Sequence, residues 1–258
     1  MSGELATSAF VLRTRPFGES DRIVTFITEQ HGKLAGIAKG AKNSRRRFGG
    51  TLEPFLRIRV VFQQRTSSDL VFLLRCELVG ELRAFTRDLD RFAAGSYVLE
   101  LTDRMVFGRE SGRDVYRLVQ DALTLLDAGA PCDPLLRAFE MHLLTASGYA
   151  PVLDRCRSCA RPIGDDPAVF IALEREGLLC RSCVRSGERV RPVATTAADA
   201  LARLAASPLA SAATVVDASA AADAATITEQ LVAAVTGGSG HARRFMARAR
   251  VDSPGGVR

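Results

Sequence analysis

The chain has 258 residues, of which 47% are hydrophobic and 25% are charged, and its net charge is +6. This composition is typical of a soluble globular protein of one to three domains. No apolar run is long enough to cross a bilayer, and the first residues lack the basic and apolar regions of a signal peptide. We therefore expect a cytoplasmic protein with no membrane partner.

The excess positive charge lies in the first third of the chain. Residues 1–84 contain 14 basic and 8 acidic residues, whereas residues 85–258 contain 21 of each. A localised positive field predicts a polyanion as the partner of the N-terminal part. A solvated surface with a charge bias is the alternative.

The N-terminal part predicts β-structure. Leu56, Ile58 and Val60 alternate with Arg57 and Arg59, which is the period of a strand with one wet face. Five such strands are expected, at Ser8–Arg15, Asp21–Thr28, Lys33–Lys39, Leu52–Gln64 and Leu70–Leu82. Five strands with a long connection between the third and the fourth favour an OB-type barrel, and an SH3-like barrel is the competing interpretation.

From Phe85 onward the apolar residues recur at helical spacing. Helices are expected from Leu89 to Val106, over residues 115–126 and 134–144, and at Ala197–Ala206, Thr226–Val235 and His241–Arg250. Ser207–Ala225 has few large apolar residues and is expected to be a loose loop or weak helix, and Asp252–Arg258 is expected to fray. The predicted fold class is α+β, with an OB-fold domain at 1–83 and an all-α domain at 84–258.

Four cysteines predict a metal site inserted in the helical domain at 152–190. Cys156 and Cys159 form one C-x-x-C pair, and Cys180 and Cys183 form a second, with twenty residues between the pairs. This spacing is typical of a four-thiolate zinc site, in which tetrahedral Zn²⁺ has no open position for water. The site is therefore expected to be structural, with a strand at residues 168–173 and a turn at residues 176–177 between the pairs. Two disulfides or a redox-active pair are the alternatives.

A glycine-bounded basic loop is the best candidate for function. Its five cations occupy nine residues with no acid among them, and they are Lys39, Lys42, Arg45, Arg46 and Arg47. Guanidinium and ammonium groups contact phosphates and release counterions, so the loop predicts nucleic-acid binding. Phe48, and less directly Phe17, are expected to stack on unpaired bases. The chain has no Trp and three Tyr, which favours contact with the nucleic-acid backbone over base readout.

Several N-terminal segments together resemble the bacterial RecO family of recombination mediators. These segments are Glu19-Ser-Asp-Arg22-Ile-Val-Thr-Phe, His31-Gly-Lys33, Gly36-Ile-Ala-Lys-Gly-Ala-Lys42, Arg46-Arg-Phe48-Gly and Leu52-Glu-Pro-Phe55. The helical segment, the four cysteines and Arg243-Arg244-Phe245 also resemble that family, so the likeness extends over nearly the whole chain.

The resemblance implies a role in DNA repair and homologous recombination through the RecF pathway. It implies binding of single- and double-stranded DNA, annealing of complementary strands, and loading of RecA onto DNA coated by single-strand-binding protein (SSB). RecR and the C-terminal tail of SSB would be partners, and the protein would associate with the nucleoid. DNA contact would fall on Lys33 and on the five cations of the basic loop, and we add Arg22. Zinc ligation would fall on the four cysteines.

We find no catalytic motif and do not expect an enzyme. His31, His142 and His241 are the only histidines, and no zinc-protease, nucleophile-elbow or phosphate-loop motif is present. An RNA-binding OB-fold and zinc protein of the translation apparatus is the main alternative. A zinc hydrolase or nuclease and a scaffold that binds only proteins are two further ones.

Overall fold

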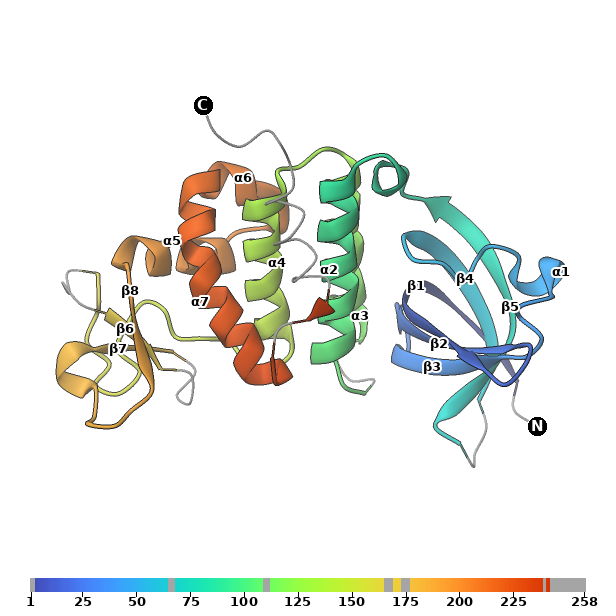
Figure 1. Cartoon of the computed structure of the whole chain (residues 1–258), viewed down its shortest axis with the longest axis horizontal. Coiled ribbons are helices and arrows are strands. Elements are labelled where there is room, and N and C mark those ends of the chain that lie inside the picture. Colours follow the sequence, from blue (N-terminus) through green and yellow to red (C-terminus); the bar gives the residue numbers. More distant parts are fainter. Residues whose placement is uncertain are drawn as a thin grey trace. The chain divides into compact units, whose positions relative to one another are not determined.

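Figure 1 shows the computed structural model of the whole chain, which consists of two compact units. Unit 1 consists of residues 1–128 and 241–258, and unit 2 of residues 129–240. The structure describes residues 3–64, 68–108, 112–164, 169–172, 177–238 and 240–241. Among these residues, no helix has the length and the apolar character that a membrane span requires.

Unit 1 begins with five strands that close into a barrel in the order β1-β2-β3-β5-β4. The strands are β1 (Glu4–Phe17), β2 (Asp21–Thr28), β3 (Gly32–Ala38), β4 (Leu56–Gln63) and β5 (Leu70–Glu81). All neighbours are antiparallel except β3 and β5, which pair in parallel. This confirms the predicted five-stranded N-terminal barrel.

Side chains alternate along each strand between the barrel core and the outer side, and this alternation determines which residues form the core. In β3, Leu34 and Ala38 point into the core, whereas Lys33, Ala35 and Ile37 lie on the outer side and are only half-buried. A Cβ at Gly36 would lie 2.6 Å from a methyl carbon of Leu73, so any larger residue at this inward position would force the Leu73 and Val71 side chains to move.

Two predicted features before β4 differ from the structure. The strand expected from Leu52 begins only at Leu56, because Phe55 has a left-handed backbone (φ +65°) that a strand cannot contain. The basic loop contains a short helix, α1 (Arg45–Phe48), whose N-cap hydroxyl on Ser44 accepts a hydrogen bond from the Arg47 N–H.

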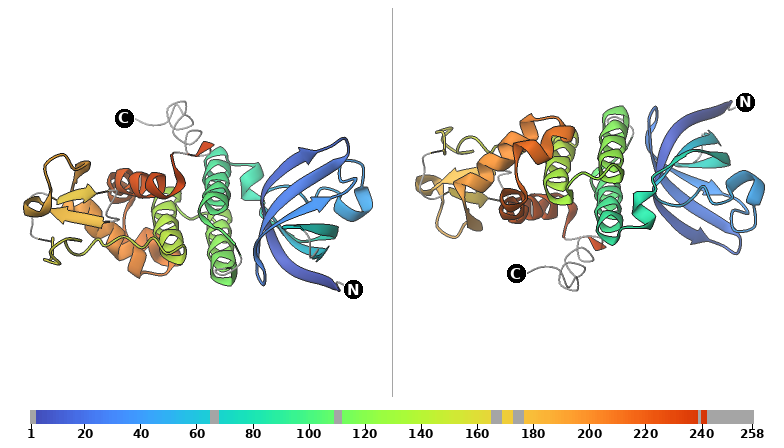
Figure 2. Two further views of the ribbon diagram at one scale, coloured as in Figure 1. Left: turned by 90° about the horizontal axis from the view of Figure 1, so that it is seen from below. Right: turned by 90° about the horizontal axis from the view of Figure 1, so that it is seen from above.

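The described residues that follow the barrel in unit 1, up to Asp127, are mostly helical and pack on the barrel. It contains the short helix η1 (Ala84–Thr86), α2 (Leu89–Met105) and α3 (Gly112–Asp127). Helix α2 contacts β1, and α3 contacts β2 and β3. The two views of Figure 2 agree that α2 and α3 run side by side next to the barrel. The predicted domain boundary at 83/84 falls between β5 and η1. The compact unit that contains the barrel extends further, to residue 128, and includes α2 and α3.

Unit 2 combines helices with a small sheet. The helices are α4 (Cys132–Ala146), η3 (Arg181–Cys183), α5 (Thr195–Ala206), η4 (Leu209–Ser211), α6 (Ala212–Val215) and α7 (Ala218–Thr236). The strands β6 (Val169–Ala172), β7 (Gly177–Cys180) and β8 (Val190–Val193) form a three-stranded sheet in the order β7-β6-β8. Helices α4, α5 and α7 pack on one another.

Four predicted segments of the C-terminal half either differ in part from the structure or fall wholly or partly outside the described residues. Of the loose loop or weak helix expected at Ser207–Ala225, the helical alternative holds for much of the segment, because η4, α6 and the first two turns of α7 occupy it. Small alanines such as Ala212, Ala221 and Ala224 are buried there, so the segment packs without large side chains. The helix expected at His241–Arg250 lies outside the described residues beyond His241, as do the frayed end expected at Asp252–Arg258 and part of the turn at 176–177.

Candidate nucleic-acid interface and metal centre

The basic loop is fixed to the turn between β1 and β2. The Lys42 N–H donates to the Ser20 carbonyl at 3.0 Å, and Lys42 Nζ donates to the Glu19 carbonyl at 2.7 Å. The Gly40 N–H donates to Oδ1 of Asp21 at 2.8 Å. These bonds hold the start of the loop in one conformation, with the Lys42 side chain exposed at its rim.

The arginines complete the loop. An Arg47 Nη donates to the Lys39 carbonyl at 2.8 Å, which joins the two ends of the loop. Arg45 and Arg46 are exposed, and within the described part of the chain no ion pair engages either guanidinium. The loop therefore carries cations that are available to an external anion.

The structure separates the other two predicted cations from this loop. Lys33 lies at the opposite end of β3, where its Nζ is 2.9 Å from Oδ1 of Asp103 in α2 and its side chain is 19% exposed. Arg22 forms an exposed ion pair with Glu53 at 3.2 Å. Both cations already face a carboxylate, so an external phosphate would have to compete for them.

The predicted stacking role of Phe48 is wrong. Its side chain is 3% exposed and packs in the barrel core with Leu52 and Cys76. The expected exposure is lost because α1 turns its last residue inward. Phe17, at the end of β1, is 49% exposed and stays available.

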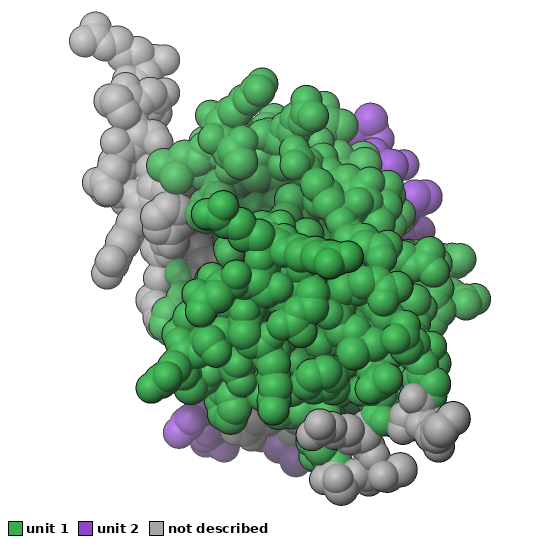
Figure 3. Space-filling model, turned by 90° about the vertical axis from the view of Figure 1, so that its right-hand side faces the viewer, with its two compact units in different colours: residues 1–128, 241–258 green, residues 129–240 purple. Residues whose placement is uncertain are grey.

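Sequence reasoning missed Arg13 and Arg15 on β1. Both are exposed, and the strand register places Arg13 opposite Thr25 and Arg15 opposite Ile23. They project from the outer side of the β1–β2–β3 sheet. Arg13 pairs with Asp103 at 3.1 Å, as Lys33 does, whereas Arg15 extends the positive surface away from the basic loop. Their spacing of two residues in a predicted strand was the available signal. Figure 3 shows the surface of this barrel end of unit 1, from which long side chains project.

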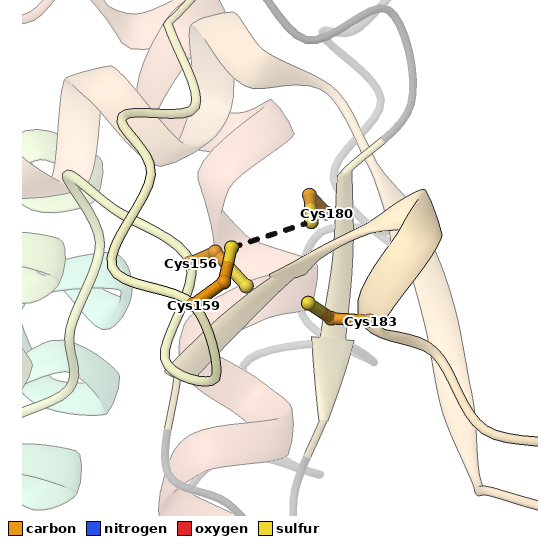
Figure 4. A group of neighbouring side chains, drawn as sticks. All are labelled: Cys156, Cys159, Cys180 and Cys183. Carbon is orange, nitrogen blue, oxygen red and sulfur yellow. Dashed lines mark hydrogen bonds between the residues drawn. The ribbon is translucent and has the colours of Figure 1, made fainter.

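The four cysteines converge on one point in unit 2. Figure 4 shows that Cys156 and Cys159 come from a loop, Cys180 from the end of β7, and Cys183 from η3, which follows directly. Their Sγ atoms all lie within 4.8 Å of one another, and those of Cys159 and Cys180 are 3.9 Å apart. Thiolates about 2.3 Å from a tetrahedral Zn²⁺ are roughly 3.8 Å apart, so the cluster fits a zinc ion.

Backbone hydrogen bonds hold the first cysteine pair in place. The Cys156 N–H donates to the Arg161 carbonyl at 2.8 Å, and the Ala160 N–H donates to the Cys156 carbonyl at 2.8 Å. Ala160 has φ +61°, a turn conformation that folds the chain back toward the sulfurs. The Arg157 N–H donates to the Leu178 carbonyl at 2.7 Å, which ties this pair to β7 and so to the second pair.

The pKa values within the four-cysteine cluster also favour binding of a cation. Burial alone would raise the pKa of Cys156, but hydrogen bonds from backbone N–H groups, among them that of Cys180, outweigh it and lower this pKa to about 6. The Ser182 hydroxyl lowers the pKa of Cys180, whereas the neighbouring Cys180 raises the pKa of Cys183 to about 12. Nearby thiolates repel each other, so without a cation one keeps its proton, and a divalent ion would replace it.

The sequence matches two family descriptions that together cover most of its length. Residues 1–82 match Recombination protein O N terminal, and residues 86–244 match Recombination protein O C terminal. The chain belongs to the RecO family.

Its curated relatives agree with this membership. A DNA repair protein RecO of Anaeromyxobacter sp. (strain K) is 41% identical over 204 residues, which is 79% of this chain and 80% of the relative. The Geobacter metallireducens DNA repair protein RecO is 40% identical over 192 residues, covering 73% and 76% of the two chains. The one from Syntrophus aciditrophicus is 37% identical over 177 residues, covering 69% and 68%. The resemblance seen in the sequence motifs is thereby confirmed.

Proposed function

We propose that this chain is a DNA repair and recombination mediator that acts by binding rather than by catalysis. The observation that carries this proposal is the basic loop, which presents guanidinium groups from a fixed position on the barrel of a RecO-family protein. Guanidinium groups match phosphate oxygens of either single- or double-stranded DNA.

The proposed mechanism is electrostatic. Cations of the loop screen the phosphates of two complementary strands and so lower the cost of bringing them together for annealing. Contact with SSB, through its C-terminal tail, would expose the strand for RecA, and RecR would act as a further partner near the nucleoid. The family membership and the names of the relatives as DNA repair proteins support these roles.

We further propose that the cysteine cluster binds one structural Zn²⁺. Cys156, Cys159, Cys180 and Cys183 would hold it, and a fully coordinated ion would join the two loops without taking part in a reaction. The buried positions of Cys156 and Cys180 support a folding role.

The first test replaces Arg45, Arg46 and Arg47 together by Ala and measures DNA affinity over a salt series. Each lost phosphate contact lowers the slope of log affinity against log salt by roughly 0.7 on single strands, so the slope should fall by about two. Affinity should fall by a similar factor for all sequences, because phosphate contacts carry no sequence information.

The matched control replaces three exposed arginines of unit 2, Arg185, Arg189 and Arg203, which makes the same change in net charge. An equal effect in the control would mean that net charge alone governs binding, and an unchanged slope in the loop variant would remove the loop from the interface. Annealing of labelled complementary strands, bare and coated with SSB, tests the mediator role. Preference for RNA over DNA would favour the translation alternative.

A further inference from the structure

Phe107 is an aromatic side chain left in solvent just beyond the end of α2. It is 75% exposed, the largest fraction among the large hydrophobic residues in the described part of the chain. Single exposed apolar residues are common on protein surfaces and need no function. The contacts and charges around Phe107 indicate whether it has a function that such residues usually lack.

The backbone beside Phe107 is held to the barrel. The Lys33 N–H donates to the Gly108 carbonyl at 3.2 Å, so the residue after Phe107 is bonded to β3. At the next helix, a Cβ on Gly112 would lie 2.4 Å from the backbone of Gly32, so α3 starts in direct contact with the same end of β3. An anchored aromatic ring loses little entropy when a ligand stacks on it.

Positive groups lie beside the ring. Lys33 Nζ lies over one face of the Phe107 ring, 5.8 Å from its centroid, and Asp103 holds that ammonium in place, which leaves the other face for a base. Asp103 also pairs with Arg13 at 3.1 Å, and the Arg13 side chain is 57% exposed. An aromatic face next to positive groups is the composition of sites that bind single-stranded nucleic acid.

Phe107 and the basic loop lie at opposite ends of β3. Lys33 and Lys39 are six residues apart, which in a strand is about 20 Å. Between these ends, the outer side of the sheet presents exposed arginines on β1 and half-buried apolar residues on β3, with buried residues of β2 between them. In register these are Arg13, Thr25 and Ala35 in one row and Arg15, Ile23 and Ile37 in the next.

We infer that Phe107 stacks on an unpaired base of a single DNA strand that runs from the basic loop past the exposed Arg15 and Arg13 of β1. The inference rests on the proposed function and adds to it a base contact that double-stranded DNA cannot supply. The basic loop contacts phosphates of either form, whereas Phe107 favours the single-stranded one.

The test compares Phe107→Ala with the unchanged protein on two oligonucleotides of equal length, one of thymidines and one of abasic sites. Loss of one stacking contact should weaken binding to the thymidine strand about tenfold. Binding to the abasic strand should not change, and the salt slope should stay the same on both because no phosphate contact is lost. Leu89→Ala, which removes a 58% exposed side chain from the same unit, should change neither affinity.

A second variant gives a direct signal. The chain has no tryptophan, so Phe107→Trp introduces a single fluorophore at the proposed contact. Its affinity should match or exceed that of the unchanged protein, and its fluorescence should be quenched by the thymidine strand and not by the abasic strand.

The two proposals fail in different ways. Three results would each overturn the stacking contact and leave the proposed function standing: an equal loss on both oligonucleotides, an unchanged affinity of Phe107→Ala, or an emission of Phe107→Trp that thymidines do not affect. If the unchanged protein bound neither oligonucleotide at low salt, the proposed function would fall and the stacking contact with it.

Discussion

Cys76 is a thiol enclosed in the barrel core, away from the metal cluster. Its side chain is 6% exposed, and burial raises its pKa to about 12, against a smaller opposing effect of a hydrogen bond with Thr51. An apolar environment disfavours the thiolate, so Cys76 acts as a small hydrophobic residue.

The stability of the barrel should therefore fall at alkaline pH through this one residue. The unfolded chain releases the thiol proton near pH 9, whereas the folded chain keeps it up to about pH 12. The contribution of Cys76 is thus complete below pH 9 and is lost as the pH rises toward 12, and the loss reaches about 1.4 kcal/mol at pH 10. Denaturant unfolding of the unchanged protein and of Cys76→Ala at pH 8 and pH 10 measures it.

The effect of Cys76 is the difference between the two proteins in how much unfolding free energy each loses from pH 8 to pH 10. Other groups titrate equally in both, so the variant should lose less stability between the two pH values. Parallel losses would show that the thiol of Cys76 reaches water in the folded state.

Phe55 adopts a backbone conformation that is unfavourable for a large side chain. Its φ of +65° is compensated by aromatic packing: its ring stacks on Phe85 with centroids 4.4 Å apart and meets Phe92 edge-on at 5.5 Å. This cluster links the segment before β4 to η1 and α2, so a strained residue here fixes where the helices begin.

At the scale of elements, α2 accommodates this cluster through one glycine. A Cβ at Gly95 would lie 2.6 Å from the Phe85 ring and 2.7 Å from the Phe55 ring. Glycine in a helix interior normally costs about 1 kcal/mol relative to alanine, so its presence in the middle of α2 indicates close packing.

Gly95→Ala should consequently destabilise unit 1, although the same change usually stabilises a helix. We expect a loss of about 1–3 kcal/mol from overpacking, partly offset by the gain in helix propensity. Thermal unfolding followed by circular dichroism measures it. Ser96→Ala, one residue further along α2, is the control and should be neutral or slightly stabilising; a stabilising Gly95→Ala would contradict the packing seen here.

Local patterns were sufficient to predict most elements. The run of β-branched and apolar residues at 21–28 predicted the bounds of β2 as observed, and the C-x-x-C spacing predicted the cysteine cluster because two intervening residues fix the reach of both sulfurs. The Ala-rich segment at 207–225 was predicted only as a loose loop or weak helix because small side chains pack there against α4 and α5, which a search for large apolar residues does not detect.

Which candidate DNA-binding side chains are exposed is decided by tertiary contacts, and no local sequence pattern contains these. Lys33 has the sequence context of a DNA-binding residue, but Asp103, seventy residues away, decides how exposed its charge is. The exposure of the two phenylalanines was equally beyond local patterns. Phe48 is buried in the barrel, whereas Phe107 is exposed beyond the end of a helix.

At the scale of the whole molecule, the two proposed sites lie in different compact units. The basic loop belongs to unit 1 and the cysteine cluster to unit 2, within residues 129–240. Metal and DNA should therefore act on different parts of the chain.

Removal of zinc should unfold the cysteine loops and leave the salt slope of DNA binding unchanged. Zinc binding contributes on the order of 10 kcal/mol in small zinc domains, so a strong chelator or Cys180→Ser should abolish zinc binding and lower the melting temperature. Zinc content by a colorimetric assay should be one ion per chain before treatment. A reduced salt slope after chelation would instead show that the metal shapes the DNA-binding surface.

The parallel pairing of β3 with β5 has a consequence for motion. It joins only Ala35 to Leu70, Gly36 to Val71 and Ile37 to Phe72, whereas the other seams of the barrel are longer. The shortest seam needs the fewest bonds broken, so those amide hydrogens of residues 35–37 and 70–72 that bond across it should exchange with solvent sooner than those that bond across the β4–β5 seam. Because β3 leads directly into the basic loop, each transient opening there would also change the spacing of the cations that meet a DNA strand.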